Sequence, residues 1–209
     1  MNSKLFPGKE TDEELFVSNE EIYSKFFDRH VIPFLDIKDG AVCMDVGSAN
    51  PRMEYMKRKT GLNVLQLEVN DLNFDEIGKL QIWWSGGIAD VFFVFDVIEH
   101  LQNPLWFMNQ LKQAIRSDGS IYVLYPCNPR WLWHPIHYNE IPPDHFIRWI
   151  AHPLELEVVR QKKIIDINWK AYLIGFRPLC KVLSGQTPLR TFLRSLFYVR
   201  YHIFELKKT

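Results

Sequence analysis

The sequence of 209 residues lacks several features that would assign it to a class at once. It has three cysteines and no Cys-x-x-Cys pair, which argues against a disulfide framework and a zinc ribbon. Its first residues form no apolar signal segment, and no run of 18 apolar residues exists to span a membrane. The formal net charge of zero argues against a nucleic-acid partner bound by bulk charge. We therefore expect a cytoplasmic, reducing setting, in which Cys43 of an apolar strand is a buried, inert thiol.

The charge that is present is unevenly distributed. From residue 160 onward there are 11 Lys and Arg residues and only two acids, Asp166 and Glu205. Because the net charge of the whole chain is zero, residues 1–159 carry a net negative charge. The basic part either meets something anionic or packs against the acidic part. Its stretch 169–183 could lie peripherally on an anionic membrane or bind a lipid-linked substrate. We favour the other interpretation, a helical insertion packed on the sheet with its charges solvated.

Apolar runs and helical patterns alternate along the chain, with short connections. This alternation predicts right-handed crossovers and a mostly parallel α/β sheet. A turn at Asp118-Gly119 is expected to precede the fourth strand. The predicted strands are 41–46, 63–69, 91–95, 120–125, 154–165 and 198–207, and the predicted helices include 51–61, 104–116 and 142–150.

Two of the predicted strands end in polar residues. The first ends in Asp45-Val-Gly47-Ser-Ala49, and another runs into Asp96-Val-Ile-Glu-His100. Such ends meet at the carboxyl edge of a parallel sheet, where α/β proteins bind ligands. Gly47 and Ala49 are small enough for close backbone approach, and Asp45 can orient the loop or receive a ligand ammonium. These features predict a nucleoside-type cofactor site.

Glu68 ends the neighbouring predicted strand, 23 residues after Asp45. A carboxylate at that spacing can accept two hydrogen bonds from ribose hydroxyls. The alternative is that both acids are ordinary strand-end carboxylates.

These motifs resemble those of class I S-adenosylmethionine-dependent methyltransferases of the small-molecule type. The family's acidic-x-Gly-x-Gly loop is matched by 45–49, with Ala49 in place of the second glycine, and its ribose-binding acid by Glu68. Its Val-Leu-Glu-His-Leu type motif is matched by 96–101, and the resemblance covers about 38–165. The resemblance implies a doubly wound, Rossmann-like, mostly parallel seven-stranded sheet whose last strand is antiparallel. The family's third strand is not clear in this sequence.

The resemblance also implies a cofactor, a reaction and a set of site residues. The cofactor is S-adenosylmethionine, and the reaction is methyl transfer to an oxygen or nitrogen of a small-molecule acceptor such as a sugar, a lipid-linked compound or a quinone. His100 and His137 are the candidates for the base that deprotonates the acceptor. The expected cofactor contacts are Asp45, Val46, Gly47, Ser48, Ala49, Glu68, Val69, Asp96, Val97 and Ile98.

One methyltransferase-like domain is expected over 1–209. It comprises an N-terminal helical segment (1–37), an aromatic substrate-covering loop (126–150) and a basic helical insertion (166–196). No metal site is expected, because the histidines near Pro135 lack the spacing of a ligand set. Two other functions stay open. One is a non-catalytic cofactor-binding or interaction protein on the same fold. The other is a nicotinamide-dependent oxidoreductase, which the few glycines of the loop disfavour.

Overall fold

The computed structural model describes residues 24–47, 51–67, 87–127, 141–167 and 198–209. The predicted alternation of strands and helices is found in these residues. The helices and helical turns are η1 (Phe27–Val31), η2 (Ile32–Phe34), α2 (Pro51–Thr60), η3 (Ile98–His100), α4 (Pro104–Ala114), α5 (Pro143–Phe146) and η5 (Ile147–Ala151). The strands are β1 (Cys43–Val46), β2 (Val64–Leu67), β3 (Ala89–Phe95), β4 (Ile115–Pro126), β5 (Leu156–Ile167) and β6 (Tyr198–Lys208).

The strands form one twisted sheet in the order β2-β1-β3-β4-β6-β5. The first four pair in parallel, and β6 lies antiparallel between β4 and β5. The expected Rossmann-like sheet with an antiparallel last strand is therefore confirmed. The expected count of seven is corrected to six strands in the part of the chain that the structure describes. Residues 68–86, where the unclear third strand of the family was sought, lie outside that part.

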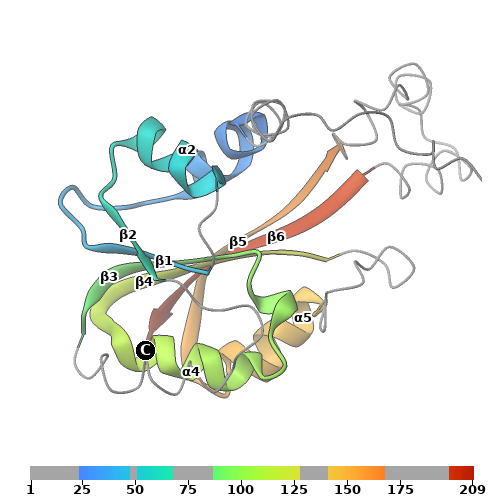
Figure 1. The fold of residues 1–209 in the computed structure, drawn as a ribbon. Coiled ribbons are helices and arrows are strands. Elements are labelled where there is room, and N and C mark those ends of the chain that lie inside the picture. The colour runs from blue at the N-terminus through green and yellow to red at the C-terminus, as the bar shows by residue number, and fades with distance from the viewer. Residues whose placement is uncertain (1–23, 48–50, 68–86, 128–140, 168–197) are drawn as a thin grey trace, which may run out of the picture.

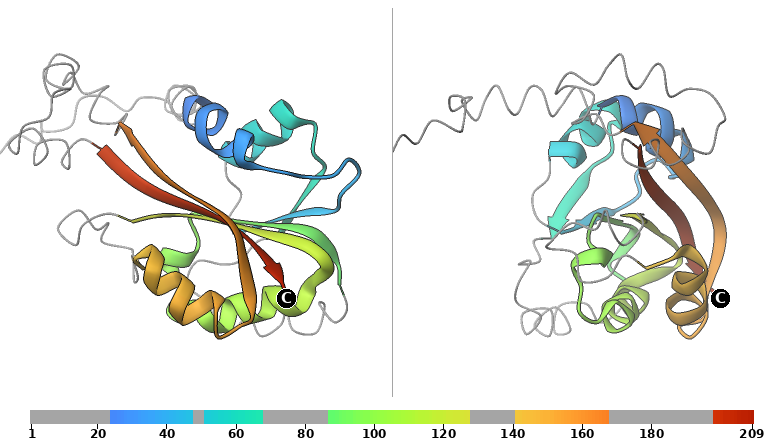
Figure 2. Two further views of the ribbon diagram at one scale, coloured as in Figure 1. Left: turned by 180° about the vertical axis from the view of Figure 1, so that it is seen from behind. Right: turned by 90° about the vertical axis from the view of Figure 1, so that its right-hand side faces the viewer.

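Helices cover both faces of the sheet (Figure 1). The η1 and α2 segments lie on one face, and α4 and α5 lie on the other, which two further views confirm (Figure 2). Side chains alternate between the two cores along each central strand. In β3, Phe92 and Val94 join the core under α4, whereas Phe93 and Phe95 join the core under α2. A strand covered on both faces is apolar throughout, which is why β3 reads as a continuous hydrophobic run.

The start of β4 differs from the prediction. The strand begins at Ile115, directly after α4, and the expected turn at Asp118-Gly119 is instead an irregularity within it. Ala89 pairs with Ile115 but Val91 pairs with Ser120, so β4 carries extra residues there. A Cβ on Gly119 would lie 2.6 Å from a side-chain carbon of Ile115, so this glycine permits close packing rather than a turn.

Several local predictions are confirmed. The helix predicted to begin at residue 104 does so, with Pro104 in the first turn of α4. The structure adds a cap to that prediction, because the Asn103 side chain accepts a hydrogen bond of 3.0 Å from the Trp106 amide. Cys43 is buried, and burial raises the pKa of its thiol to about 11, as expected of an inert cysteine. The division of the domain into segments stays a prediction, since most of 1–37, 126–150 and 166–196 lies outside the described residues. Among the described helices, none is long and apolar enough to cross a membrane.

Candidate functional site

The carboxyl edge of the sheet brings the two polar strand ends together. β1 and β3 are parallel neighbours in which Asp45 pairs with Phe93, so Gly47 and Asp96 follow strands that end side by side. Asp45 and Val46 are the last residues of β1, and Val97 and Ile98 lead into η3. The other predicted site residues, Ser48, Ala49, Glu68, Val69 and His137, lie outside the described residues.

Gly47 follows β1 and packs closely against Val97, which follows β3. Its φ of +152° is a conformation that residues with a side chain rarely adopt. A Cβ placed on it would lie 3.1 Å from a methyl carbon of Val97. Its amide donates a 3.1 Å hydrogen bond to the carbonyl of Leu67 on β2. The buried glycine therefore lets β1, β2 and the residues after β3 pack closely at the carboxyl edge, where open α/β sheets bind ligands.

Asp45 is a buried carboxyl at this junction, with only 4% of its surface exposed. Burial raises its pKa to about 6, and a hydrogen bond from the Gln66 side chain partly opposes this rise. The Gln66 amide nitrogen also donates to the carbonyl of Gly47 at 3.1 Å. Gln66 thus ties the carboxyl to the loop, which supports the interpretation of Asp45 as a residue that orients it.

Asp96 is held at the edge by both its backbone and its side chain. Its φ of 55° is left-handed, an uncommon conformation that aspartate tolerates better than most residues. Its amide donates a 2.8 Å hydrogen bond to the carbonyl of Leu124. Its carboxylate forms an ion pair with Arg52, in the first turn of α2, and both side chains are about four-fifths buried. The ion pair thus links the start of α2 to the end of β3 and places opposite charges side by side at the edge.

His100 lies on η3, just beyond the edge, and is partly buried. Its Nε2 is 3.9 Å from a carboxylate oxygen of Glu99, whose own exposure is 1%. This acid therefore lies beside the imidazole of His100. His100 stays a candidate base, four residues after Asp96.

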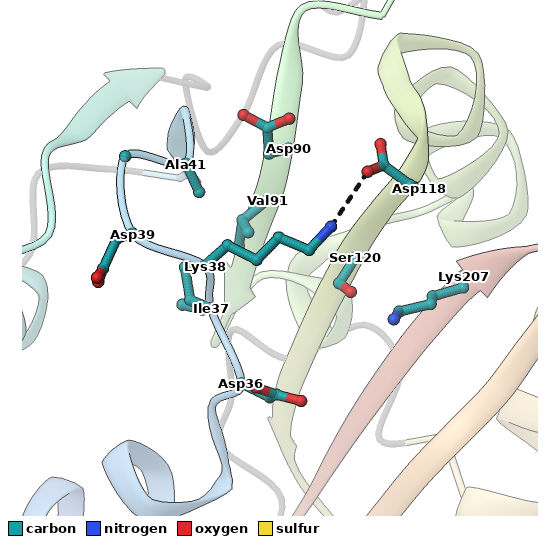
Figure 3. A pocket seen from close by; sticks show the side chains of 11 residues that line it. Asp36, Ile37, Lys38, Asp39, Ala41, Asp90, Val91, Asp118, Ser120 and Lys207 are labelled. Carbon is teal, nitrogen blue, oxygen red and sulfur yellow. Dashed lines mark hydrogen bonds and ion pairs between the residues drawn. The ribbon is translucent and has the colours of Figure 1, made fainter.

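The opposite, amino edge of the sheet also has a pocket, of about 280 Å³ (Figure 3). Its charged groups serve the fold. Lys38 pairs with Asp118 at 3.3 Å, both largely exposed. Asp90 accepts a 2.7 Å hydrogen bond from the Val42 amide, and its hydrogen bonds to Arg116 hold its pKa below the usual range. We assign no ligand to this pocket.

The whole architecture matches solved structures closely enough to define the fold, although no protein-family model and no curated protein matches the sequence. A methyltransferase dependent on S-adenosylmethionine from Archaeoglobus fulgidus superposes with a TM-score of 0.56 at 14% identity, over 93% of this chain and 97% of that one. A protein of Bacillus halodurans that is named a putative methyltransferase superposes with a TM-score of 0.57 at 9% identity, over 90% of this chain and 99% of that one. The fold is that of S-adenosylmethionine-dependent methyltransferases.

This methyltransferase fold also hosts other reactions. A [4+2]-cyclase superposes with a TM-score of 0.52 at 10% identity, over 90% of this chain and 80% of that one. The reaction must therefore be argued from the site itself.

Sequence reasoning missed two residues of this site, Arg52 and Gln66. Arg52 follows the loop as one cation of a basic helix, and only the reach of its side chain to Asp96 distinguishes it. Gln66 sits in the middle of a Leu-x-Leu strand as an ordinary polar residue. Gln66 could have been found from the neighbouring strand, because a buried aspartate needs a hydrogen-bond donor and Gln66 is the polar residue in the middle of that strand.

Proposed function

We propose that this protein is a methyltransferase that uses S-adenosylmethionine and methylates an oxygen or nitrogen of a small molecule. The observation that carries the proposal is the close packing of Gly47 against Val97, which joins the ends of β1 and β3 at the carboxyl edge, beside the ion pair of Arg52 with Asp96. The fold supports it, since the site lies at the strand ends where open α/β sheets bind ligands.

The residues present fit the amino-acid part of this cofactor. That part is a zwitterion, with a carboxylate and an ammonium on one carbon. The ion pair of Arg52 with Asp96 offers one partner for each charge, so exchanging the internal pair for the zwitterion leaves no charge unpaired. The packing of Gly47 against Val97 holds the ends of β1 and β3 together beside this ion pair. When bound, S-adenosylmethionine supplies a methyl group on a sulfonium, activated for attack.

The chain's own residues then have limited chemistry to perform. Methyl transfer from a sulfonium needs the acceptor atom held in line, and a base if that atom carries a proton. His100, with Glu99 at 3.9 Å, is the described candidate for that base. His137, the second candidate from the sequence, stays a prediction.

Calorimetric titration of the full chain with S-adenosylmethionine, and in parallel with NADH, tests the proposal. We expect saturable binding of S-adenosylmethionine and none of NADH. No binding of S-adenosylmethionine at millimolar concentration would refute it. Binding without methyl transfer across a broad panel of acceptors would favour the non-catalytic alternative.

A further inference from the structure

A second pocket, of about 550 Å³, opens at the carboxyl edge of the sheet, beyond β4. We call it the basic pocket. That volume suits a small molecule. Its lining includes Cys127, Asp144, Gln161, Lys163, Arg200 and His202.

The sheet topology explains why residues so distant in sequence meet here. β6 runs antiparallel to β4, so it begins at the edge where β4 ends, and β5 approaches the same edge. Tyr125, His202 and Lys163 are partners in one row across β4, β6 and β5. Side chains alternate along each strand, so His202 lies on the same face as Phe204, whose ring packs against that of Phe146 at the end of α5.

The row of Tyr125, His202 and Lys163 places the basic pocket within reach of a small molecule that also extends to the cofactor site. Asp96 is hydrogen-bonded to β4 through Leu124, and His202 is one strand further. Strands lie about 4.8 Å apart, so about 10 Å separates the Asp96 position from His202 and about 14 Å separates it from Lys163. A small molecule can span that interval, with one end near the cofactor site and the other in the basic pocket.

The charges of the lining favour an anion. Lys163 and Arg200 are cations, and Asp144 is the one acid among the described lining residues. In the described part of the chain, no ion pair engages Lys163. Burial, and then the charge of Lys163, lowers the pKa of His202 to about 4. At neutral pH His202 is thus an uncharged imidazole that can donate or accept a hydrogen bond without adding charge.

We propose that the basic pocket binds an anionic group, a carboxylate or a phosphate, on the methyl acceptor, and so selects acceptors that can place such a group about 10–14 Å from the Asp96 position. This inference rests on the proposed function for the identity of the acceptor. The binding of an anion by the pocket can be tested without it.

The test is a titration of the full chain with inorganic phosphate and, separately, with acetate, at constant ionic strength maintained with chloride. The NMR signal of the His202 ring, assigned with a His202→Gln variant, reports occupancy. We expect a saturable shift and a higher pKa for His202, because a bound anion favours its charged form. Lys163→Gln should weaken binding at least tenfold.

The matched control is Lys162→Gln. Lys162 is the next residue of β5 and points to the other face, where its amine donates to the carbonyl of His30 at 3.4 Å. This variant should bind both anions as the parent protein does. The comparison of phosphate with acetate shows which anion the pocket prefers. Absence of saturation with both anions, or equal binding by the parent protein and Lys163→Gln, would overturn the inference.

Turnover measurements separate this inference from the proposed function. Acceptors are compared as pairs that differ only in a free carboxylate or its methyl amide. We expect Lys163→Gln to raise KM for the anionic member at least tenfold and to leave KM for the amide and the Kd of S-adenosylmethionine unchanged. If S-adenosylmethionine does not bind at all, the proposed function fails while the anion titration still decides the role of the pocket.

Discussion

The buried carboxyl of Asp45 makes the stability of this protein depend on pH in a predictable way. Its pKa is about 6 in the folded chain, against an ordinary value of 3.8, and burial is the main cause. The folded state therefore binds the proton more tightly than the unfolded state, and this contribution to stability is present below about pH 4 and lost as the pH rises through 6. The pKa difference corresponds to about 3 kcal/mol.

The variant Asp45→Asn keeps the size of the side chain and removes the charge. It should match the parent protein at about pH 3.5 and be more stable at about pH 8 by up to about 3 kcal/mol. Urea denaturation of both proteins across this range measures the difference. A surface control, Asp118→Asn, replaces a carboxyl whose side chain is 70% exposed and should give a much flatter difference. A difference for Asp45→Asn that does not change with pH would refute the reasoning.

The protonation of Asp45 near pH 6 also distinguishes the two roles that the sequence left open for this residue. If its carboxylate receives the ammonium of the cofactor, affinity for S-adenosylmethionine should rise as the pH increases through about 6. If it only orients the loop through Gln66, affinity should be nearly flat over that interval. Calorimetry at several pH values distinguishes them.

Three further outcomes are expected. Gly47→Ala should weaken S-adenosylmethionine binding at least tenfold in calorimetry, since the new Cβ meets Val97 in a strained conformation; unchanged affinity would show that the packing of Gly47 on Val97 does not shape the cofactor site. Arg52→Gln should raise the Kd of S-adenosylmethionine more than that of decarboxylated S-adenosylmethionine, because Arg52 is assigned to the carboxylate of the cofactor. Equal effects on the two Kd values would contradict the proposal that Arg52 exchanges Asp96 for this carboxylate. Gly119→Ala should lower the free energy of unfolding by about 1–3 kcal/mol in urea, because its Cβ would overlap packed atoms; a neutral effect would show that the strand can shift.

The local sequence pattern was sufficient to predict those helices and strands that are defined by an apolar run or by residues that favour a helix start. The continuous apolar run of β3 and the Asn103-Pro104 start of α4 are examples, because burial on both faces and helix capping act within a few residues. The same logic failed at Asp118-Gly119. There, the pairing of β4 with β3 and close packing on Ile115 decided the conformation, and neither is visible in a short window.

The sequence by itself determined that two acidic strand ends would meet at one edge, since parallel strands place their carboxyl ends together. Only the tertiary structure decided how charge is arranged there. The partnership of Arg52 with Asp96 depends on the reach of a long side chain. The basic pocket depends on the antiparallel return of β6, which sets residue 202 beside residue 163. Strand order and register are long-range properties fixed by burial of the whole sheet, so no local pattern specifies them.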